Sequence, residues 1–493
     1  MNKAIFITIL SCLLAWQASA QTFATGLNFD DAAYALTPLK KAEIQRSYEN
    51  LPAKVDLKPY CPTPQKQGDY KTCVGWAVGY AACSITEGVA KNIQEKSVLN
   101  DLASSPDFVY AIGKSVQDMQ CKRGASIDAT LVKLKGRTIP RKKDFRAFCA
   151  TSNALPTVTR EGANISDFTR LFKDSDPFSV RLALIKKALA NKKPVIVGID
   201  CPKSFMIAQD IWSGDQSEYI GGHALCIVGY DDSVQGGVVD MMNSWGEEWG
   251  EKGFTKVQYR HLETILKYAY EIKMDIGSSS NNPSMPVAND AKMSPKMTST
   301  ISLKLVDGTE MAVQKLRNED LRGLRPVKET AQTAVETDKI SIKSQYKTLK
   351  GYKSGTQYRI YITVSEPVYL YVLGSDLTHN ISALFPADAT MSPYISNKNA
   401  TIALPDEKWT IEMDNTKGKD IMLVLYSKEP LDITKMIQAW NTQPEAAYEK
   451  IYRTYAAKML PDTGFNLDTQ NMGFQAPLSI DAIILLSLEI EHQ

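Results

Sequence analysis

Histidine is scarce in this chain, and its scarcity limits the chemistry that the sequence can support. Only four histidines occur among 493 residues, and no cluster of histidine, cysteine and carboxylate residues has the spacing of a metal site. The formal net charge is only +2, so the chain lacks the one-sided charge of proteins that bind nucleic acid or an anionic membrane surface. The sequence therefore predicts no metal, no other cofactor and no nucleic-acid partner.

Long apolar runs are absent beyond the N-terminus. There, an apolar run follows Lys3 and ends in small residues, which is the pattern of a secretory signal peptide over residues 1–20 with Gln21 as the new terminus. A lipoprotein cut before Cys12 is disfavoured because it would leave too short an apolar run ahead of the cut. The most apolar later stretch, 480–490, is interrupted by acidic residues and is predicted to be a buried strand. We expect an exported protein, periplasmic or extracellular, without a transmembrane segment.

Cysteine is absent after Cys226, and all the cysteines that follow the predicted signal peptide lie between Cys61 and Cys226. In an oxidising compartment six of them can pair, which would leave Cys73 as the free thiol. The equally weighted alternative is that several are simply buried thiols. The sequence does not choose among the possible pairings of these six residues: Cys61, Cys83, Cys121, Cys149, Cys201 and Cys226.

The chain divides by composition into two blocks. A short polar lead-in at 21–50 precedes a block at 51–276, in which helical patterns come first and antiparallel strand patterns follow. A Ser-, Asn- and Pro-rich linker is expected at 277–300, and short alternating strands fill 301–493. The predicted fold class is thus α+β, followed by a β-rich C-terminal domain.

Several elements can be placed within these blocks. Helices are predicted at 73–85, where the residues are small and apolar on all sides, at 180–190, and after Pro444. Strands are predicted at 194–199, 223–230, 238–243, 254–259, 358–364 and 368–373.

Three residues stand at ends of these elements with chemistry that fits together. Cys73 opens the buried helix, whose first-turn N–H groups favour a thiolate. His223 opens a strand, and Asn243 ends the next one; a turn near Ser233 lies equidistant from both, so an antiparallel pair would set them opposite each other. Asn243 would accept from Nδ1–H of the imidazole and leave Nε2 facing the thiol. Taken singly, each residue also fits a structural role in packing, at a strand end or in a turn.

Short motifs surround these residues in a specific order. They are Gln67-Gly68 six positions before Cys73, then Gly221-Gly222-His223-Ala224, and then Asn243-Ser244-Trp245-Gly246 followed by Trp249-Gly250. Together they resemble the papain-like cysteine peptidases over roughly 51–275. The variant at 72–77 is similar to the bacterial branch of that family.

The resemblance implies a two-lobed domain, with a helical lobe and an antiparallel β lobe, and a secreted peptidase that acts on peptide or protein substrates. Cys73 would attack the peptide carbonyl and form a thioester, and His223 would hold the thiolate as an ion pair and then protonate the leaving amine. Asn243 would orient His223, and Trp245 would shield their hydrogen bond. Gln67 would donate to the oxyanion beside the backbone N–H of Cys73.

Four departures from the family pattern carry expectations of their own. Tyr70 replaces a half-cystine, so the disulfide near the nucleophile must differ or be absent. Val74 replaces the tryptophan that usually follows the nucleophile. The lead-in at 21–50 is too short for the family's long helical propeptide, which argues against autoinhibition in the usual manner. The region that would build the cleft, 121–126, matches only loosely, so no substrate preference follows from it.

The second block resembles a known domain, and the motifs of the first block also allow two functions other than that of a peptidase. Residues 350–430 resemble a bacterial β-rich accessory domain of unassigned function, whose partner is unknown; binding of a surface, a glycan or a protein substrate is a hypothesis. The alternatives to a peptidase are a non-catalytic binding protein that keeps the papain fold and an acyl transferase that uses the same thiol. Because every polar group that the chemistry needs is present, an active peptidase is the leading interpretation.

Overall fold

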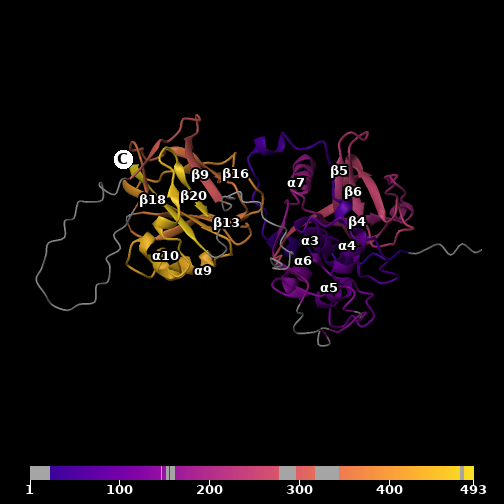
Figure 1. The fold of residues 1–493 in the computed structure, drawn as a ribbon. Helices are drawn as coiled ribbons and strands as arrows, with labels where there is room; N and C mark the ends of the chain where they lie inside the picture. The colour runs from indigo at the N-terminus through magenta and orange to yellow at the C-terminus, as the bar shows by residue number, and fades with distance from the viewer. Residues whose placement is uncertain are drawn as a thin grey trace, which may run out of the picture.

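The computed structural model contains two domains, each with a hydrophobic core of its own, and Figure 1 shows them side by side. The predicted signal peptide and most of the predicted linker lie outside the described residues. No helix within the described part of the chain is both long and apolar enough to span a membrane. The described residues are 23–145, 147–151, 155, 161–276, 296–316, 344–376, 378–477 and 482–493.

The helical lobe of the first domain is built around one long buried helix, as the pattern at 73–85 predicts. All residues from Cys73 to Cys83 are buried. Gly75 and Gly79 allow a neighbouring helix to approach closely, since a Cβ on Gly75 would lie 2.3 Å from the carbonyl oxygen of Pro106. The long helix consists of α2 (Cys73–Gly75), a π-helical stretch (Trp76–Cys83) and α3 (Ser84–Ala90); beside it lie α4 (Lys96–Leu102), α5 (Pro106–Gly113) and α6 (Ile127–Leu134).

The β lobe is an antiparallel sheet in the order β2-β3-β8-β4-β5-β6-β7, with β1 paired to β5. The four strands that the sequence predicts in this block are present as β4 to β7, and the helix predicted at 180–190 is α7 (Phe178–Ala190). The strands are β1 (Lys54–Asp56), β2 (Thr138–Ile139), β3 (Ala163–Arg170), β4 (Val195–Pro202), β5 (Tyr219–Asp231), β6 (Val238–Met242), β7 (Phe254–Gln258) and β8 (Leu266–Met274), and α8 (Tyr259–Ile265) joins the last two.

The second domain is a β-sandwich with two helices on one outer face. One sheet has the order β10-β11-β21-β18-β13-β14, with β15 on β13, and the other the order β16-β12-β9-β20-β19, with β17 on β12. Alternate residues of β13 and β18 face the sandwich core and the helices α9 and α10, which explains why 368–373 and 421–426 are apolar on both faces. β9 begins at Lys296, so the predicted linker end at 300 is too late. The helix expected after Pro444 is α10, whereas α9 was not predicted.

The elements of the second domain have the following bounds. The strands are β9 (Lys296–Leu305), β10 (Val313–Lys315), β11 (Tyr346–Thr348), β12 (Gln357–Val364), β13 (Val368–Ser375), β14 (Ile381–Phe385), β15 (Tyr394–Ile395), β16 (Ala400–Leu404), β17 (Ile411–Glu412), β18 (Gly418–Ser427), β19 (Asn466–Leu467), β20 (Met472–Pro477) and β21 (Ile484–His492), and the helices are α9 (Ile433–Trp440) and α10 (Ala447–Tyr455).

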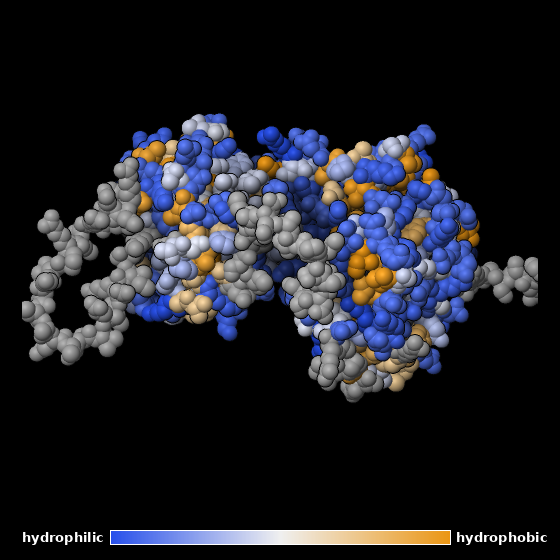
Figure 2. Space-filling model, viewed as in Figure 1, coloured by the Kyte–Doolittle hydropathy of each residue, from blue (hydrophilic) through white to orange (hydrophobic). Residues whose placement is uncertain are grey.

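The lead-in segment contacts both domains. We call residues 23–45 the strap. It contains one α-helix, α1 (Asp31–Leu36), which Asp30 caps: the Asp30 carboxylate accepts from the backbone N–H of Ala33. Near its other end, Leu39 forms backbone bridges to residues of both domains. Figure 2 shows that the two domains present mainly hydrophilic surface on the face in view, with apolar residues in separate patches.

Candidate active site

Cys73 lies at the first position of α2 and is fully buried. Its sulfur lies against the backbone N–H groups of Ala224, on β5, and of Val74. Burial raises the pKa of the thiol to about 12, although these N–H groups act to lower it. In this conformation desolvation therefore outweighs the N–H groups at the start of the helix, which favours the protonated thiol over the thiolate.

His223 and Asn243 come together from neighbouring strands, although not as directly opposite residues. The register pairs Cys226 with Met242, and a bulge lies between Ile227 and Gly229. His223 and Asn243 are therefore diagonal neighbours, a separation that side chains still span. The Nε2 atom of His223 and Oδ1 of Asn243 are 2.9 Å apart.

The ring nitrogens of His223 have the opposite roles to those expected. Nε2, not Nδ1, contacts Asn243, so the expected Nδ1 pairing is wrong. Nδ1 is buried and has no hydrogen-bond partner among the described residues. The reason for the difference is the diagonal approach of Asn243, which brings its amide to the far nitrogen of the ring.

Burial also controls the protonation of His223. It lowers the pKa of the imidazole to about 4, and the hydrogen bond to Asn243 acts in the opposite direction. The Trp245 indole stacks on the imidazole with centroids 4.7 Å apart and an interplanar angle of 19°. The indole thus covers the ring next to its bond to Asn243. At neutral pH the site in this conformation holds a neutral thiol and a neutral imidazole.

The Gln67 side chain is held by its carbonyl oxygen, which leaves its N–H groups facing the cleft. Oε1 accepts from the Ser244 hydroxyl at 2.6 Å, and the backbone N–H of Gln67 donates to the Ser244 carbonyl at 2.8 Å. Nε2 donates to the carbonyl oxygens of Tyr70 at 2.6 Å and Ala24 at 3.0 Å. Ser244 belongs to the motif read from the sequence but was assigned no role there.

The first residues of the strap cover this site. The Phe23 ring stacks on Trp245 with centroids 4.8 Å apart. The carbonyl oxygen of Ala24 accepts from the Trp245 indole at 2.9 Å as well as from Gln67. The Ala24 carbonyl of the strap therefore occupies Nε2–H of Gln67, the donor that was predicted to bind an oxyanion.

The next strap residues pair with the backbone of both lobes. The N–H groups of Gly26 and Leu27 donate to the Gly222 carbonyl on β5 at 3.1 and 2.9 Å. On the helical lobe, Ala125 donates to the Gly26 carbonyl at 3.0 Å and accepts from the N–H of Asn28 at 2.9 Å. The strap thus lies between the lobes, where Leu27 forms isolated β-bridges to Gly222 and Ala125.

Glycine is required where the strap and the cleft meet. Gly26 has φ of +142°, and a Cβ there would lie 2.4 Å from the carbonyl oxygen of Lys71. A Cβ on Gly124 would lie 2.3 Å from the Gly26 oxygen, and one on Gly222 would lie 2.5 Å from the Leu27 oxygen. The described part of the lead-in, 23–50, contains only short helices, yet it occludes the site through this close fit.

One disulfide is present among the described residues, between Cys121 and Cys149. The interpretation in which six cysteines pair is therefore wrong, and the alternative of buried thiols holds for the others. The disulfide differs from the family's, as Tyr70 implied, and the Tyr70 ring instead packs on Phe148, beside Cys149, with centroids 4.3 Å apart. The free thiols, all buried, are Cys61, Cys73, Cys83, Cys201 and Cys226.

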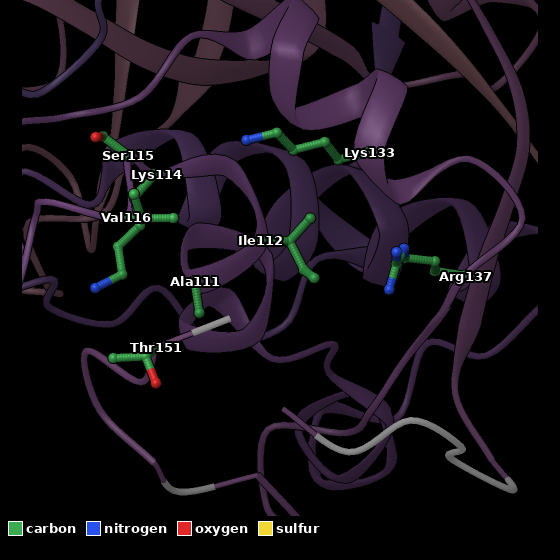
Figure 3. Close-up of a pocket in the computed structure, with 8 residues that line it drawn as sticks. All are labelled: Ala111, Ile112, Lys114, Ser115, Val116, Lys133, Arg137 and Thr151. Carbon is green, nitrogen blue, oxygen red and sulfur yellow. The ribbon is translucent and has the colours of Figure 1, made fainter. Parts of the chain in front are cut away.

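A separate groove of about 520 Å³ lies on the helical lobe. Lys114, Lys133 and Arg137 line it, together with Ile112 and Val116 (Figure 3). None of the predicted site residues contributes to it. The groove therefore plays no part in the arrangement around Cys73.

Cys73 on the helical lobe and His223 on the β lobe lie close together, because the backbone of Ala224, the residue after His223, contacts the Cys73 sulfur. Residues 52–273 match the model of the papain family of cysteine proteases, and 351–430 match that of a domain of unknown function, DUF4384. The chain thus carries a papain-family cysteine protease domain followed by a separate DUF4384 domain.

The chain is also similar to individual proteins. Cathepsin B-like CP3 of Giardia intestinalis is 26% identical over 262 residues, which cover 49% of this chain and 83% of that protein. Vignain of Ricinus communis is 36% identical over 103 residues, but the match spans only 20% of this chain and 28% of vignain. Among solved structures, xylellain, a cysteine protease from Xylella fastidiosa, has 18% identity and a TM-score of 0.40 over 51% of this chain and 95% of its own.

Proposed function

We propose that the first domain hydrolyses peptide bonds through Cys73, His223, Asn243 and Gln67, and that the conformation described is its latent form. The observation that carries the proposal is the hydrogen bond between Nε2 of His223 and Asn243, which leaves Nδ1 of His223 without a partner among the described residues. The next residue, Ala224, has its backbone N–H against the Cys73 sulfur, so His223 lies next to the thiol. Without the strap, water would reach the site, and the ion pair of thiolate and imidazolium would regain its solvation.

The proposed reaction uses these groups in sequence. His223 takes the Cys73 proton at Nδ1, and the thiolate attacks the peptide carbonyl carbon. The negative oxygen accepts from Gln67 Nε2–H and the backbone N–H of Cys73, as the Ala24 carbonyl accepts from Gln67 in the latent form. His223 then protonates the leaving amine, which gives a thioester. Water, deprotonated by His223, releases the acid and restores the Cys73 thiol.

We further propose that the protein is exported and acts in the periplasm or outside the cell. The predicted signal peptide at 1–20 supports export. The Cys121–Cys149 disulfide supports an oxidising compartment, because reduced thiols prevail in the bacterial cytosol. Peptides or unfolded proteins are the proposed substrates, since the strap itself binds the cleft through backbone hydrogen bonds that any extended peptide can form.

The completely covered, neutral site favours a second candidate, a non-catalytic protein that keeps the fold. The test that separates the two is hydrolysis of an unfolded protein by the full chain with the strap displaced by Gly26→Ala, followed by mass analysis. New free carboxyl termini are expected for a peptidase. Products joined to an added amine would instead indicate an acyl transferase, and intact substrate would favour the binding protein.

Ser244 is expected to act through Gln67. In the Gly26→Ala background, Gln67→Ala should lower kcat by about 10²–10³ because the oxyanion loses a donor. Ser244→Ala should lower kcat by about tenfold with KM unchanged, because the amide then loses the bond that fixes its orientation. The double variant should match Gln67→Ala alone. Independent losses that multiply in the double variant would contradict a positioning role for Ser244.

Latency is expected to be insensitive to pH between about 4 and 6.5. Burial lowers the pKa of the covered His223 to about 4 and raises that of Cys73, so the covered site holds one proton, on Cys73. The open ion pair also holds one proton, on His223, so opening transfers a proton but binds none. The measurement is the rate of Cys73 alkylation in the unaltered chain relative to that of Gly26→Ala at each pH. The ratio should stay constant; a ratio that rises as pH falls would show that opening binds a proton and would contradict the ion pair.

A further inference from the structure

We propose that the second domain acts as a latch for the strap, so that occlusion of the site depends on both domains. This gives the DUF4384 domain a regulatory role, and its consequence for activity rests on the proposed peptidase function of the cleft. The strap residues that follow α1 lie between the two domains, in the junction visible in Figure 1.

The backbone of the strap at Leu39 is shared by the two domains. Leu39 donates its N–H to the Thr390 carbonyl at 2.7 Å and accepts from the N–H of Ser392 at 2.9 Å. The residues on either side of Leu39 bond to the backbone of Arg170, at the end of β3, at 3.0 and 2.9 Å. Farther along, the N–H of Ile44 donates to the Thr401 carbonyl on β16 at 3.0 Å. The strap therefore joins strands of the two domains.

A strap carboxylate contacts both domains through its two oxygens. Oε1 of Glu43 accepts from Nδ2 of Asn397 at 2.6 Å, and Oε2 pairs with Lys187 on α7 at 3.1 Å. Glu43 and Asn397 are both buried. Loss of either partner would leave part of a buried charge unpaired, which is costly.

A second buried ion pair network reinforces the same junction. Glu271 on β8 accepts from Lys40 of the strap at 2.5 Å and from Lys193 at 2.6 Å. Lys193 also donates to the Ser396 carbonyl of the second domain at 2.7 Å. The two lysines hold the pKa of Glu271 down to about 2 although burial alone would raise it. The carboxylate is thus charged and fixes the strap next to the second domain.

The second domain also has contacts to the first that bypass the strap. The Tyr369 hydroxyl donates to Asp167 on β3 at 3.0 Å, and the Lys273 ammonium lies 4.8 Å from the Tyr369 ring centroid and 5.2 Å from that of Tyr394. The second domain therefore remains a fixed platform against which the strap is held.

Few strap residues without anchoring contacts lie between the part that binds the second domain and the part that lies in the cleft. α1 lies between them and is anchored by the Tyr34 hydroxyl, which donates to the Phe172 carbonyl at 3.0 Å, and by Asp31, which accepts from Tyr268 at 2.6 Å. Only Phe29 and Asp30 separate α1 from Asn28, whose backbone N–H donates to the Ala125 carbonyl on the helical lobe. A change at the latch is therefore transmitted to the cleft.

Hydrogen exchange of the full-length protein tests the latch independently of cysteine chemistry. The amides of 26–28 report on the cleft because each is bonded to it. Asn397→Asp keeps the shape of the side chain but sets a second carboxylate against Glu43, and should accelerate exchange of these amides about tenfold or more. The matched control is Asn380→Asp, an exposed residue whose side chain has no contact with the strap.

A second pair of variants tests the backbone bond without any change of charge. Ile44 has φ of −60°, which proline adopts, so Ile44→Pro removes its N–H with little change in φ, whereas Ile44→Ala keeps the N–H. Faster exchange at 26–28 in Asn397→Asp and Ile44→Pro, but not in the two controls, would support the latch. Exchange equal to that of the unaltered chain in both variants would overturn it. Faster exchange without any reaction of Cys73 would leave the latch standing and refute the proposed peptidase function instead.

Discussion

Gly26→Ala is expected to raise the rate of Cys73 alkylation by about 10²-fold, because the added methyl group cannot share the cleft with the backbone of Lys71. The ideal Cβ would lie 2.4, 2.5 and 2.7 Å from three backbone atoms of Lys71, and Gly26 has a φ that other residues rarely adopt. Lys71 is itself tied by its N–H to the Cys121 carbonyl at 2.8 Å, so it cannot move aside easily. If the collision and the backbone strain raise the free energy of the closed form by about 3 kcal/mol, the ratio of open to closed molecules rises by about 10².

The control for this variant is Gly136→Ala. Gly136 also has positive φ, +75°, but nothing lies within 4 Å of an added Cβ. The control therefore carries the backbone strain without the collision in the cleft. Alkylation by iodoacetamide, followed by intact mass, gives the rates, and a melting curve shows that both variants are folded. Equal rates in Gly26→Ala and the unaltered chain, or equal acceleration by Gly136→Ala, would contradict the assignment of the strap as the cover of the site.

Cys73→Ala, in the chain opened by Gly26→Ala, is expected to lower kcat by about 10⁵–10⁶, because no other group can form the acyl-enzyme. Alanine is the best helix former and is smaller than cysteine, so α2 should remain folded. The loss should appear in peptide hydrolysis measured at saturating substrate, with the melting temperature close to that of the parent.

Cys83→Ala is the matched control for the loss of a thiol. Cys83 is also a fully buried, free cysteine on the same long helix, ten positions beyond Cys73, and its neighbours are Glu87 and Arg141 and not His223. It should retain the parental kcat. Hydrolysis that persists in Cys73→Ala, or that disappears in Cys83→Ala without unfolding, would exclude Cys73 as the nucleophile.

The sequence was sufficient to predict the architecture of the first domain because its patterns are local and strong. The small apolar residues at 73–85 predicted a helix buried on all sides, and the apolar runs at 194–199 and 223–230 predicted strands, all of which are present. The motifs also indicated which side chains would meet. The ring nitrogen of His223 that faces Asn243 was predicted wrongly. The register Cys226↔Met242 makes Asn243 a diagonal neighbour of His223 and not the residue opposite, and no local pattern encodes that register.

Other features escaped prediction because they depend on distant partners. The pairing of Cys121 with Cys149 follows from how two loops approach, and six cysteines alone cannot specify it. The strap binds the cleft mainly by backbone hydrogen bonds, which leave no side-chain signature; Gly26 was the available signal, as a residue compatible with close approach. Its contacts with the second domain join residues some 350 positions apart, such as Glu43 and Asn397.

The most direct test of the central claim is the intact mass of the Gly26→Ala chain after treatment with an epoxide inhibitor of thiol proteases, beside the Gly26→Ala/Cys73→Ala chain. Such reagents need an activated thiolate next to an imidazolium, so the remaining buried thiols should not react. The account predicts one adduct on the first chain and none on the second. No adduct on a folded and reduced Gly26→Ala chain whose strap amides exchange freely, or equal labelling of both chains, would contradict it.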